Sequence, residues 1–290
     1  MTADLLQCGS RALDLSKPAV MGILNVTPDS FSDGGRLNTL DRVVDAAATM
    51  VDDGAQILDI GGESTRPGAQ AVSDDQELAR VVPTIEQLAE RFDVVLSVDT
   101  SKAVVMQAAV AAGATMINDV RALSGAGSLE AAANSDAAVC LMHMRGQPRT
   151  MQNAPRYDSV VTEVREFLSG RVARCLRAGI ATQRLCVDPG YGFAKTLEHN
   201  LQIVAKLDEI SLPDLPILFG ASRKSSIGQL LNVSVDDRLI GSVAMAILAV
   251  ERGARIVRVH DVRETVQAID IATAVRRACP SAPNKHRRLS

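Results

Sequence analysis

Short apolar segments alternate with longer amphipathic segments along almost the whole chain, and this alternation predicts the fold. Eight runs rich in β-branched and other apolar residues recur, and each ends at or near a polar residue. Their length and composition predict buried β-strands. The runs are VMGILN (20–25), QILDIGG (56–62), VVLSVD (94–99), TMIND (115–119), VCLMH (139–143), LCVD (185–188), PILFGAS (216–222) and IVRVH (256–260).

The segments between these runs have the periodicity of helices. The clearest are LDRVVDAAATMVDD, DQELARVVPTIEQLAERF and SKAVVMQAAVAA, in which apolar residues recur every three or four positions. A glycine stands at the junction between helix and strand in DGAQI, AGATM, AGIAT and RGARI. Because glycine tolerates the left-handed conformation that ends a helix, we predict C-caps at Gly54, Gly113, Gly179 and Gly253.

Near-continuous apolar strands separated by helices predict an α/β fold whose parallel sheet is buried on both faces. Eight such strands can close into a (β/α)8 TIM barrel of about 250 residues, which suits a single domain in this chain of 290 residues. An open doubly wound sheet is the alternative, but the G-x-G-x-x-G of its dinucleotide-binding form is missing. We expect an N-terminal cap over 1–18, the barrel over 19–279 and a flexible basic tail over 280–290.

Composition argues against several functional classes. The net charge is −3, Trp is absent and aromatic residues make up 2% of the chain, which disfavours a nucleic-acid surface. No stretch reaches the roughly 20 apolar residues of a membrane span, and the first ten residues lack the apolar core of a signal sequence, so we expect a cytoplasmic protein. The five cysteines lack zinc-ligand spacing and are predicted to be reduced thiols.

Polar groups stand at the exits of all the predicted strands. In a (β/α)8 barrel the active site is built at the carboxyl ends of the strands. One polar group at a strand end is common by chance, but eight such groups over seven strands are not, so we interpret these groups as lining an active site. They are Asn25, Asp59, Asp99, Asn118, Asp188, Lys224, Arg258 and His260.

Three of these groups suit a flat heterocycle. Asp99, Asn118 and Asp188 would bring two carboxylates and an amide to the barrel mouth, where they can pair with the amino and amide edges of a ring. This pattern favours binding of a small ring substrate over a proton relay. Asp99 also precedes Thr-Ser-Lys and a predicted helix, so a helix N-cap is an equally open interpretation for this residue.

The last two predicted strands indicate an anion site. Lys224 follows the seventh strand, a place where barrels often bind phosphate. Arg258 and His260 are two residues apart on the eighth strand and therefore point the same way, and a guanidinium suits phosphate oxygens. Asn25 ends the first strand, beside the eighth in a closed barrel. Its amide oxygen, together with a polyphosphate, predicts a site for one Mg²⁺.

Long loops complete the predicted mouth. The loop after the first strand contains Phe31 in a polar segment rich in turn formers, and the STRPG loop after the second strand carries Arg66, which a bare turn would not need. HMRGQPRTMQ after the fifth strand is predicted to be a third mouth loop. Its first residue, His143, is interpreted as structural or as a support for other residues.

Together these motifs resemble those of bacterial dihydropteroate synthases, in the same order and over nearly the whole chain. Small departures are Tyr191 and Ala194, where Phe and Gly are frequent in the family, and neither replaces a polar group. The motifs that carry the resemblance are GILNVTPDSFSDGG, DIGGESTRPGA, SVDTSK, INDVRAL, LMHMRGQPRTMQ, DPGYGFAK, GASRKSSIGQLL and RVHDV.

The resemblance implies a transferase of folate synthesis that joins 6-hydroxymethyl-7,8-dihydropterin diphosphate to 4-aminobenzoate and releases pyrophosphate and 7,8-dihydropteroate. It also implies three groups of binding residues. The pterin site would comprise Asp99, Asn118, Met142, Asp188, Phe193, Gly220 and Lys224. The diphosphate site would comprise Asn25 with Mg²⁺, Arg258 and His260. The aminobenzoate site would comprise Phe31, Thr65, Arg66, Pro67 and Ser222.

The chemistry of the residues agrees with this reaction. No activated Ser or Cys is placed as a covalent nucleophile, and none is needed if the leaving group departs first. Arg258, His260 and Mg²⁺ would stabilise the departing pyrophosphate, and Asp99 the pterin methylene cation. We therefore expect Asp99, Lys224, Arg258 and His260 to be the catalytic residues.

Two other functions resemble this one closely enough to be weighed. A pterin-dependent methyltransferase domain would share the barrel and the ring-binding groups, and a non-catalytic pterin-binding paralogue would share both. The predicted diphosphate residues and long loops argue against a methyltransferase, and the intact polar groups argue against loss of activity. The resemblance further implies inhibition by sulfonamides, which mimic aminobenzoate, and a homodimer.

Overall fold

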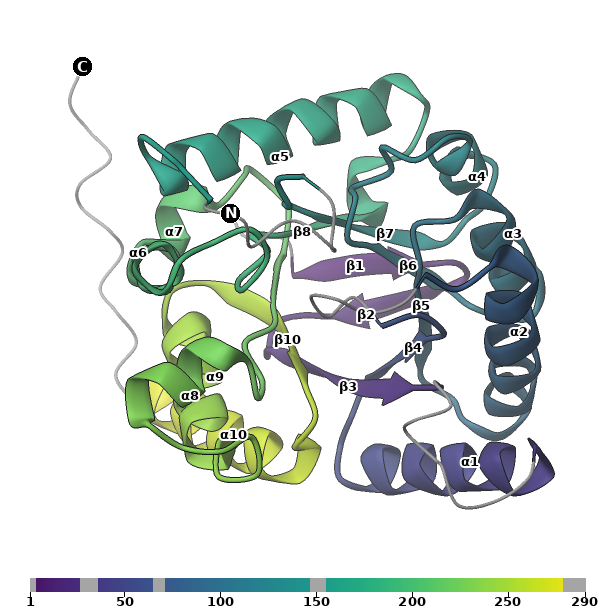
Figure 1. Ribbon diagram of the computed structural model, residues 1–290, viewed down its shortest axis with the longest axis horizontal. Coiled ribbons are helices and arrows are strands. Elements are labelled where there is room, and N and C mark those ends of the chain that lie inside the picture. Colours follow the sequence, from purple (N-terminus) through teal and green to yellow (C-terminus); the bar gives the residue numbers. More distant parts are fainter. Residues whose placement is uncertain (1–3, 27–35, 65–70, 147–154, 279–290) are drawn as a thin grey trace.

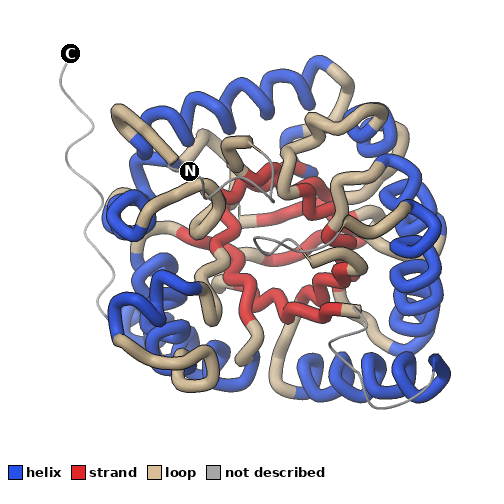
Figure 2. Tube along the Cα trace, in the orientation of Figure 1, coloured by secondary structure: helices blue, strands red, loops and turns tan. Residues whose placement is uncertain are grey.

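A closed barrel of parallel strands lies at the centre of the molecule, and helices surround it (Figures 1 and 2). The computed structural model describes residues 4–26, 36–64, 71–146 and 155–278. Around the barrel the strands follow the order β10-β3-β4-β5-β6-β7-β8-β9, so consecutive strands are neighbours and β10 closes onto β3. This confirms the predicted TIM barrel and excludes the open doubly wound sheet.

The barrel strands agree with the eight predicted runs to within a few residues. They are β3 (Ala19–Asn25), β4 (Ile57–Gly61), β5 (Val95–Asp99), β6 (Met116–Asp119), β7 (Ala138–Met142), β8 (Leu185–Asp188), β9 (Ile217–Phe219) and β10 (Ala254–Val259). Two further strands, β1 (Leu5–Cys8) and β2 (Arg11–Asp14), form an antiparallel hairpin within the segment predicted as an N-terminal cap.

Helices connect the strands and end where the glycines predict. Gly54, Gly113, Gly179 and Gly253 all have positive φ, between +89° and +116°, which confirms the predicted left-handed helix ends. The helices are α1 (Arg36–Asp52), α2 (Asp74–Arg91), α3 (Ala103–Ala111), α4 (Ser128–Ala133), α5 (Val160–Arg177), α6 (Leu197–Ala205), α7 (Leu207–Ile210), α8 (Ser225–Leu231), α9 (Leu239–Glu251) and α10 (Val262–Ala278), with a short 3₁₀ turn at Thr182–Arg184.

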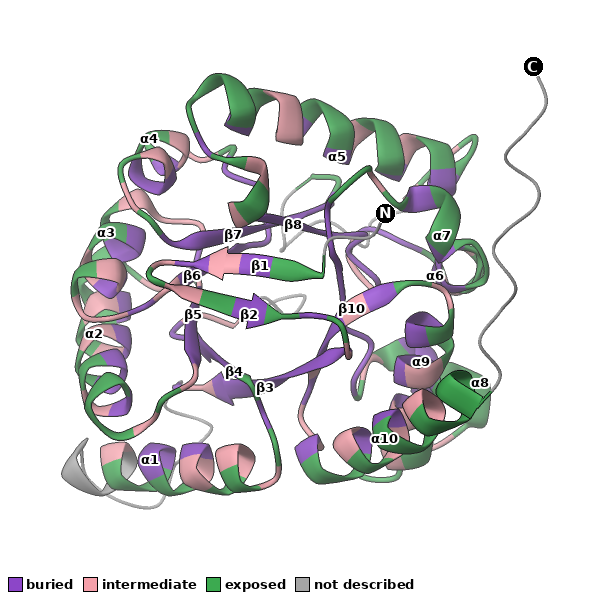
Figure 3. Cartoon of the chain, turned by 180° about the vertical axis from the view of Figure 1, so that it is seen from behind, coloured by how far each residue is buried: buried purple, intermediate pink, exposed green. Residues whose placement is uncertain are grey.

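The alternation of side chains along each strand builds two apolar layers. Outward-facing residues such as Leu58 and Val98 pack beneath the helices in the main core cluster. Inward-facing residues such as Met21 and Met116 form a second cluster, which also includes Leu6 of the hairpin. Seen from behind, the β1–β2 hairpin lies across this end of the barrel (Figure 3). The apolar layer and the hairpin together close one end, which leaves the other end for a site.

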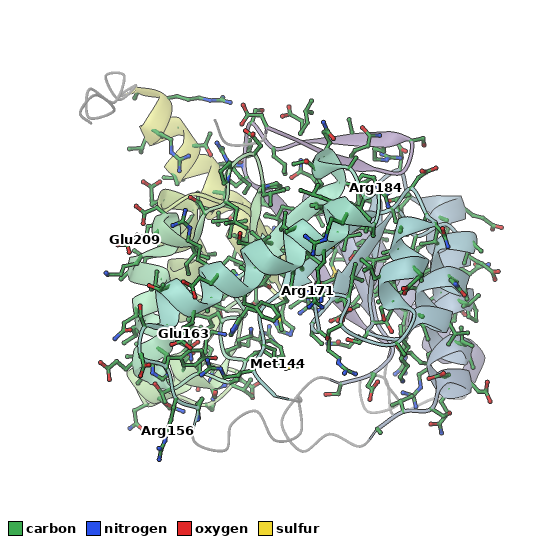
Figure 4. All side chains as sticks on the ribbon, turned by 90° about the horizontal axis from the view of Figure 1, so that it is seen from above. Met144, Arg156, Glu163, Arg171, Arg184 and Glu209 are labelled. Atoms are coloured by element: carbon green, nitrogen blue, oxygen red, sulfur yellow. The ribbon has the colours of Figure 1, made fainter. Side chains whose placement is uncertain are left out.

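The carboxyl ends of the strands lie at the end opposite the hairpin. In Figure 4, Met144, Arg156 and Glu163 lie toward that end, while Arg184 lies toward the hairpin. Met144 follows β7 and Arg184 precedes β8, so the view gives the direction of both strands. Helix α5 therefore begins beside the barrel mouth and runs back toward the hairpin, as a crossover between parallel strands requires.

Two expectations from composition can be compared with the structure. Within the described ranges, none of the helices combines the length and apolar character needed to cross a membrane. Cys8, Cys140, Cys175 and Cys186 are buried and free, which agrees with reduced thiols, and Cys279 lies outside the described residues. Burial raises the pKa of the Cys8 thiol to about 12 and that of Cys175 to about 11, so neither is a reactive thiolate at neutral pH.

Candidate active site

Four residues that are paired in register across successive strands mark the carboxyl end of the barrel. Asn25 is paired with Gly61, Gly61 with Asp99, and Asp99 with Asn118, on the successive strands β3, β4, β5 and β6. A methyl group added to Gly61 would lie 3.6 Å from Asn25 Oδ1 and 3.7 Å from Asp99 Cβ. Because Gly61 has no side chain, the Asn25 amide and the Asp99 carboxylate share the space above it.

Arg258 lies between two carboxylates. Its Nε donates a hydrogen bond to Asp59 Oδ2 over 2.5 Å, and its Nη2 donates to Asp99 Oδ2 over 2.8 Å. The Asp59 side chain is fully buried, while Asp99 is 11% and Arg258 21% exposed. Charge-assisted bonds of this kind fix the plane of a guanidinium, so Arg258 is held at the mouth in a defined orientation.

Asp59 also orients the amide of Asn118. Asn118 Nδ2 donates to Asp59 Oδ2 over 3.1 Å, and Ser97 Oγ donates to Asp59 Oδ1 over 2.6 Å. Because the Asn118 nitrogen donates to a carboxylate, the amide oxygen is the atom directed away from Asp59. One buried carboxylate thus positions both a predicted ring-binding residue and a predicted phosphate-binding residue.

The opposite side of the mouth carries Asp188 and Lys224. Asp188 Oδ1 accepts a hydrogen bond from the backbone N–H of Gly190 over 2.7 Å. Lys224 Nζ donates to the carbonyl oxygen of Tyr191 and lies 4.6 Å from the centre of the Phe193 ring. A cation over an aromatic ring is attracted to its electron-rich face. The loop after β8 therefore brings a carboxylate, an aromatic ring and an ammonium group together.

Two positions predicted to line the ring pocket, Met142 and Gly220, carry no polar side chain. Met142 is the register partner of Asp188 on the neighbouring strand and belongs to a small apolar cluster that Phe193 contacts. Gly220 lies against Arg258, since a methyl group added to it would be 3.5 Å from Arg258 Cβ. These positions supply the apolar contacts that a flat ring needs beside its polar partners.

Ser222 and His260 lie together at the exits of the last two strands. The distance between Ser222 Oγ and His260 Nδ1 is 3.0 Å, and the backbone N–H of His260 donates to the same Ser222 oxygen over 3.1 Å. Since the hydroxyl accepts from the backbone, its own proton can be donated to His260 Nδ1. A residue predicted for aminobenzoate and one predicted for diphosphate are thus adjacent.

Burial and neighbouring charges shift the titration of the mouth residues. Burial raises the pKa of Asp99 to about 7, with Asp59 adding to the rise and Arg258 opposing it. Burial lowers the pKa of Lys224 to about 8, against the opposing effect of Asp188. Burial likewise raises the pKa of Asp188, and Lys224 limits this rise. Such perturbed groups gathered in one mouth are typical of functional sites.

The structure decides between the two interpretations of Asp99. The residue before α3 is Lys102, and its side chain makes no capping hydrogen bond. The Asp99 side chain is directed to Arg258 across the barrel. The interpretation of Asp99 as a helix N-cap is therefore wrong, because the ion pair with a distant strand competes successfully with the local helix end.

Lys102 instead holds the two ends of the loop after β4. Its Nζ lies 3.0 Å from Glu63 Oε2 and 2.7 Å from Glu77 Oε2, and it donates to the carbonyl oxygen of Val72 over 2.6 Å. The base of this loop is therefore fixed beside β5. Several residues predicted for the aminobenzoate site lie outside the described residues, namely Phe31, Thr65, Arg66 and Pro67.

The oxygen ligands available at the barrel mouth can be compared with the coordination that Mg²⁺ prefers. The described part of the chain has no group of three or more His, Cys, Asp or Glu side chains that could hold a metal ion. Asn25 offers a neutral amide oxygen beside the Asp99 carboxylate. Mg²⁺ takes oxygen ligands, keeps several waters and binds few protein groups when phosphates are present. The residues fit a magnesium ion that arrives with a phosphate ligand.

Sequence reasoning missed the roles of two charged residues. Asp59 has a signal in the sequence, since it is an acid within an apolar run and two residues before Gly61, on the same face of the strand. Lys195 closes the DPGYGFAK motif but has no periodic signal, and the structure buries it against the loop after β8, 3% exposed. His143 contacts Lys195 and not the four paired residues at the carboxyl end, which agrees with its interpretation as structural.

Comparisons with known proteins agree with this geometry. The family model for a pterin binding enzyme matches residues 21–260. The chain is 55% identical over 263 residues to the dihydropteroate synthase of Escherichia coli K12, which covers 91% of this chain and 93% of that protein.

Solved structures extend the similarity to the backbone. A crystal structure of the Yersinia pestis dihydropteroate synthase with a sulfonamide drug complex superposes with a TM-score of 0.90 at 55% identity, covering 94% of this chain and 99% of that one. The Xanthomonas albilineans dihydropteroate synthase with 4-aminobenzoic acid superposes with a TM-score of 0.90 at 48% identity, covering 97% of this chain and all of that one. The chain therefore belongs to the dihydropteroate synthases of the pterin-binding enzyme family.

Proposed function

We propose that this protein is a transferase that makes 7,8-dihydropteroate. It would join the methylene carbon of 6-hydroxymethyl-7,8-dihydropterin diphosphate to the amine nitrogen of 4-aminobenzoate and release pyrophosphate. Membership of the dihydropteroate synthase family supports this reaction. The observation in this chain that carries the proposal is the buried Asp59, which bonds to both Asn118 and Arg258. The amide proposed to bind the ring and the guanidinium proposed to bind phosphate thus share one partner, which supports a site for a pterin diphosphate.

The pterin ring would be held between the two sides of the mouth. Asp99 and Asp188 offer carboxylate oxygens to ring N–H groups, and the Asn118 amide oxygen offers a third acceptor. Lys224 supplies a donor to a ring acceptor atom, next to the Phe193 ring. Met142, Phe193 and Gly220 would contact the flat faces. Several acceptors and one donor around an apolar slot distinguish a pterin from a purely hydrophobic ring.

Bond breaking would depend on charge stabilisation at both ends of the scissile bond. When the carbon–oxygen bond breaks, negative charge develops on pyrophosphate, where the guanidinium of Arg258 and the imidazole of His260 donate hydrogen bonds. Positive charge develops on the pterin methylene group, near the Asp99 carboxylate. The amine of 4-aminobenzoate then forms the carbon–nitrogen bond and loses a proton to the departing pyrophosphate or to water. No covalent enzyme intermediate is needed.

Mg²⁺ is proposed as the cofactor, and Asn25 as the protein ligand. When bound, the metal would neutralise charge on the diphosphate oxygens and so make pyrophosphate a better leaving group. The single neutral oxygen of Asn25 suits an ion whose other ligands are phosphate and water. The predicted fit can be tested without turnover, because Asn25→Ala should weaken magnesium-dependent binding of pyrophosphate in a calorimetric titration.

The second substrate would bind beside the diphosphate site. Ser222, which lies against His260, is the described member of the proposed aminobenzoate site. The Xanthomonas albilineans synthase was solved with 4-aminobenzoic acid and the Yersinia pestis synthase with a sulfonamide drug complex. At this level of identity we propose that the present protein also accepts 4-aminobenzoate and is inhibited by sulfonamides in competition with it.

Two further proposals concern the whole molecule. We propose a homodimer in the cytoplasm, as the family resemblance implies. Exposed apolar side chains on the outer helices support an interface, and Ile240 of α9 and Ile271 of α10 are 80% and 69% exposed. Analytical ultracentrifugation tests the dimer, because a sedimentation coefficient of a 30.8 kDa monomer would contradict it.

The reaction is tested with purified protein, pterin diphosphate, radiolabelled 4-aminobenzoate and Mg²⁺, followed by separation of dihydropteroate from the unreacted label. We expect labelled product that is lost on chelation of the metal and regained on adding Mg²⁺. Tight binding of pterin diphosphate without any product would contradict the proposal and favour a non-catalytic pterin-binding protein.

A further inference from the structure

Lys195 is buried against the loop that follows β8, and three hydrogen-bond partners surround its Nζ. Its Nζ lies 2.9 Å from His143 Nδ1 and donates to the carbonyl oxygens of Gly190 and Phe193, each over 2.9 Å. An ammonium group has three N–H donors, so these three partners use them all. The residue is absent from the set of groups predicted to contact substrate.

These contacts fix the loop that follows β8. Gly190 donates its N–H to Asp188 and, with Phe193, directs its carbonyl oxygen at Lys195. Gly190 has φ +69°, and a methyl group added to it would lie 1.8 Å from the carbonyl oxygen of His143. The loop is thus held tightly against the end of β7, with Lys195 at its centre.

The same loop carries most of one side of the pterin site. Asp188 begins it, the Phe193 ring lies within it, and the carbonyl oxygen of Tyr191 accepts a hydrogen bond from Lys224. The ring of Phe193 in turn lies 4.6 Å from Lys224 Nζ. A shift of this loop would move a carboxylate, a ring and an ammonium group of the proposed pterin site at once.

The imidazole that Lys195 contacts belongs to His143, the residue directly after β7. Burial and the nearby Lys195 charge lower the pKa of His143 to about 2, so its Nδ1 can accept the lysine proton. The His143 and Phe167 rings pack nearly perpendicular to each other, with 4.9 Å between ring centres. A packed, uncharged acceptor gives the ammonium a fixed anchor on the barrel wall.

A purely structural core position would not need a charge here. Burying an ammonium group costs free energy unless it is paired and hydrogen-bonded, and an apolar side chain could fill the space. Burial lowers the pKa of Lys195 well below the usual lysine value and raises that of Asp188, and the attraction between the two groups opposes both shifts. This proximity, together with the hydrogen bonds from Lys195 to the loop that follows Asp188, favours a role in placing that carboxylate.

We propose that Lys195, anchored on His143, is a positioning residue that holds Asp188, Phe193 and Lys224 in the geometry that binds the pterin ring. The proposal rests on the pterin site described above. It assigns Lys195 no contact with substrate. Its loss should therefore weaken binding of the pterin substrate, with little effect on 4-aminobenzoate, whose proposed site lies at Ser222 and His260.

The test compares Lys195→Met with Lys206→Met in the full-length protein. Lys206 is an exposed lysine that pairs with Glu209 on the outer surface, so this variant matches the change in charge. We expect Lys195→Met to raise the KM and Kd for pterin diphosphate by about tenfold to a hundredfold, the effect of losing one or two buried hydrogen bonds. The KM for 4-aminobenzoate should change less than about twofold, and Lys206→Met should match the wild type.

A second pair of variants keeps the test valid if Lys195→Met does not fold. His143→Asn retains an acceptor near the position of Nδ1, and His143→Leu removes it. We expect His143→Asn to bind pterin diphosphate much as the wild type does, and His143→Leu to show the selective loss. Wild-type pterin affinity in both Lys195→Met and His143→Leu would overturn the proposal, as would an equal loss for both substrates. Failure of the proposed reaction itself would appear separately, as absence of turnover by the wild type.

Discussion

The buried charged groups on the two sides of the barrel mouth have different kinds of hydrogen-bond partners. On the arginine side, formed by Asp59, Asp99 and Arg258, both carboxylates bond directly to one guanidinium. On the lysine side, formed by Asp188, Lys195 and Lys224, the ammonium groups donate mainly to backbone carbonyl oxygens. The arginine side thus carries one more carboxylate than cations, and the lysine side one more cation than carboxylates.

This difference suits the two tasks proposed for the mouth. A planar guanidinium fixed by two carboxylates can present its remaining N–H groups to phosphate oxygens without reorienting. The excess of carboxylate on that side is also where a methylene cation would be stabilised. On the lysine side, Lys195 and Lys224 donate to backbone carbonyl oxygens and so hold the loop after β8, which would contact the neutral pterin ring. The arginine side would therefore stabilise the developing charge, and the pterin ring would lie between it and the lysine side.

The largest effect is expected on the arginine side, from Arg258→Met. The substitution removes the donors proposed for pyrophosphate and leaves Asp59 buried without its cation. We expect kcat/KM to fall by about a thousandfold, as when a transition-state donor is lost, and stability to fall by about 3–5 kcal/mol, as when a buried pair is broken. Steady-state kinetics and urea unfolding measure the two effects. Arg258→Lys is the control that keeps the charge, and activity within tenfold of the wild type in Arg258→Met would contradict the assignment.

A smaller effect is expected from Asp59→Asn, which keeps the shape but removes the charge that joins Asn118 to Arg258. We expect kcat/KM to fall by about tenfold to a hundredfold, in the range of one or two hydrogen bonds to a charged group. A double-mutant cycle with Asn118→Ala should be non-additive, because both residues act through one bond. Ser97→Ala is the matched control, since Ser97 bonds to the other oxygen of Asp59. Additive effects would argue that Asp59 does not position Asn118.

The affinity for the pterin is expected to fall at low pH because of Asp99 on the arginine side, and at high pH because of Lys224 on the lysine side. Asp99 with a pKa of about 7 loses its acceptor charge as the pH falls below that value, and Lys224 with a pKa of about 8 loses its proton as the pH rises above that value. Affinity for 6-hydroxymethylpterin, which lacks the titrating diphosphate, should therefore be highest between these values and fall by about tenfold per pH unit on either side. Calorimetry from pH 6 to 9 measures this. Asp99→Asn should abolish the acid limb and Lys224→Met the alkaline limb, whereas a flat wild-type profile would count against both groups.

The smallest effect is expected from Arg223→Ala, directly beside Lys224 in sequence. Arg223 pairs with Asp261 through Nε and Nη2, and the two side chains are 41% and 12% exposed, so the pair is partly screened by solvent. Exposed ion pairs contribute about 0–1 kcal/mol, so both kcat/KM and the midpoint of unfolding should stay close to the wild type. A pronounced loss of pterin binding in this variant would extend the lysine side beyond the mouth. Thermal unfolding and kinetics provide the measurement.

Much of the fold was predictable because its signals are local. The apolar runs and the glycines at the helix ends determine strands, helices and their order, and eight parallel strands leave few ways to bury both faces. Strand parity also places Arg258 inside the barrel, two residues after Ile256 of the inner apolar layer. Asp99 was ambiguous because its local context fits a helix cap equally well, and only a partner from β10 decides between the two.

The sequence by itself determined the barrel, the polar ends of its strands and the motifs that resemble one family. Only the tertiary structure decided which of those polar groups meet. Arg258 and Asp59 are 199 positions apart, and Arg258 and Asp99 are 159 apart, so their pairing depends on the closure of β10 onto β3. The burial and the hydrogen-bond partners of Asp59 and Lys195 likewise depend on the tertiary structure. Hydrophobic periodicity fixes the direction in which a side chain points, but the charges it will face there are contributed by strands far away along the chain.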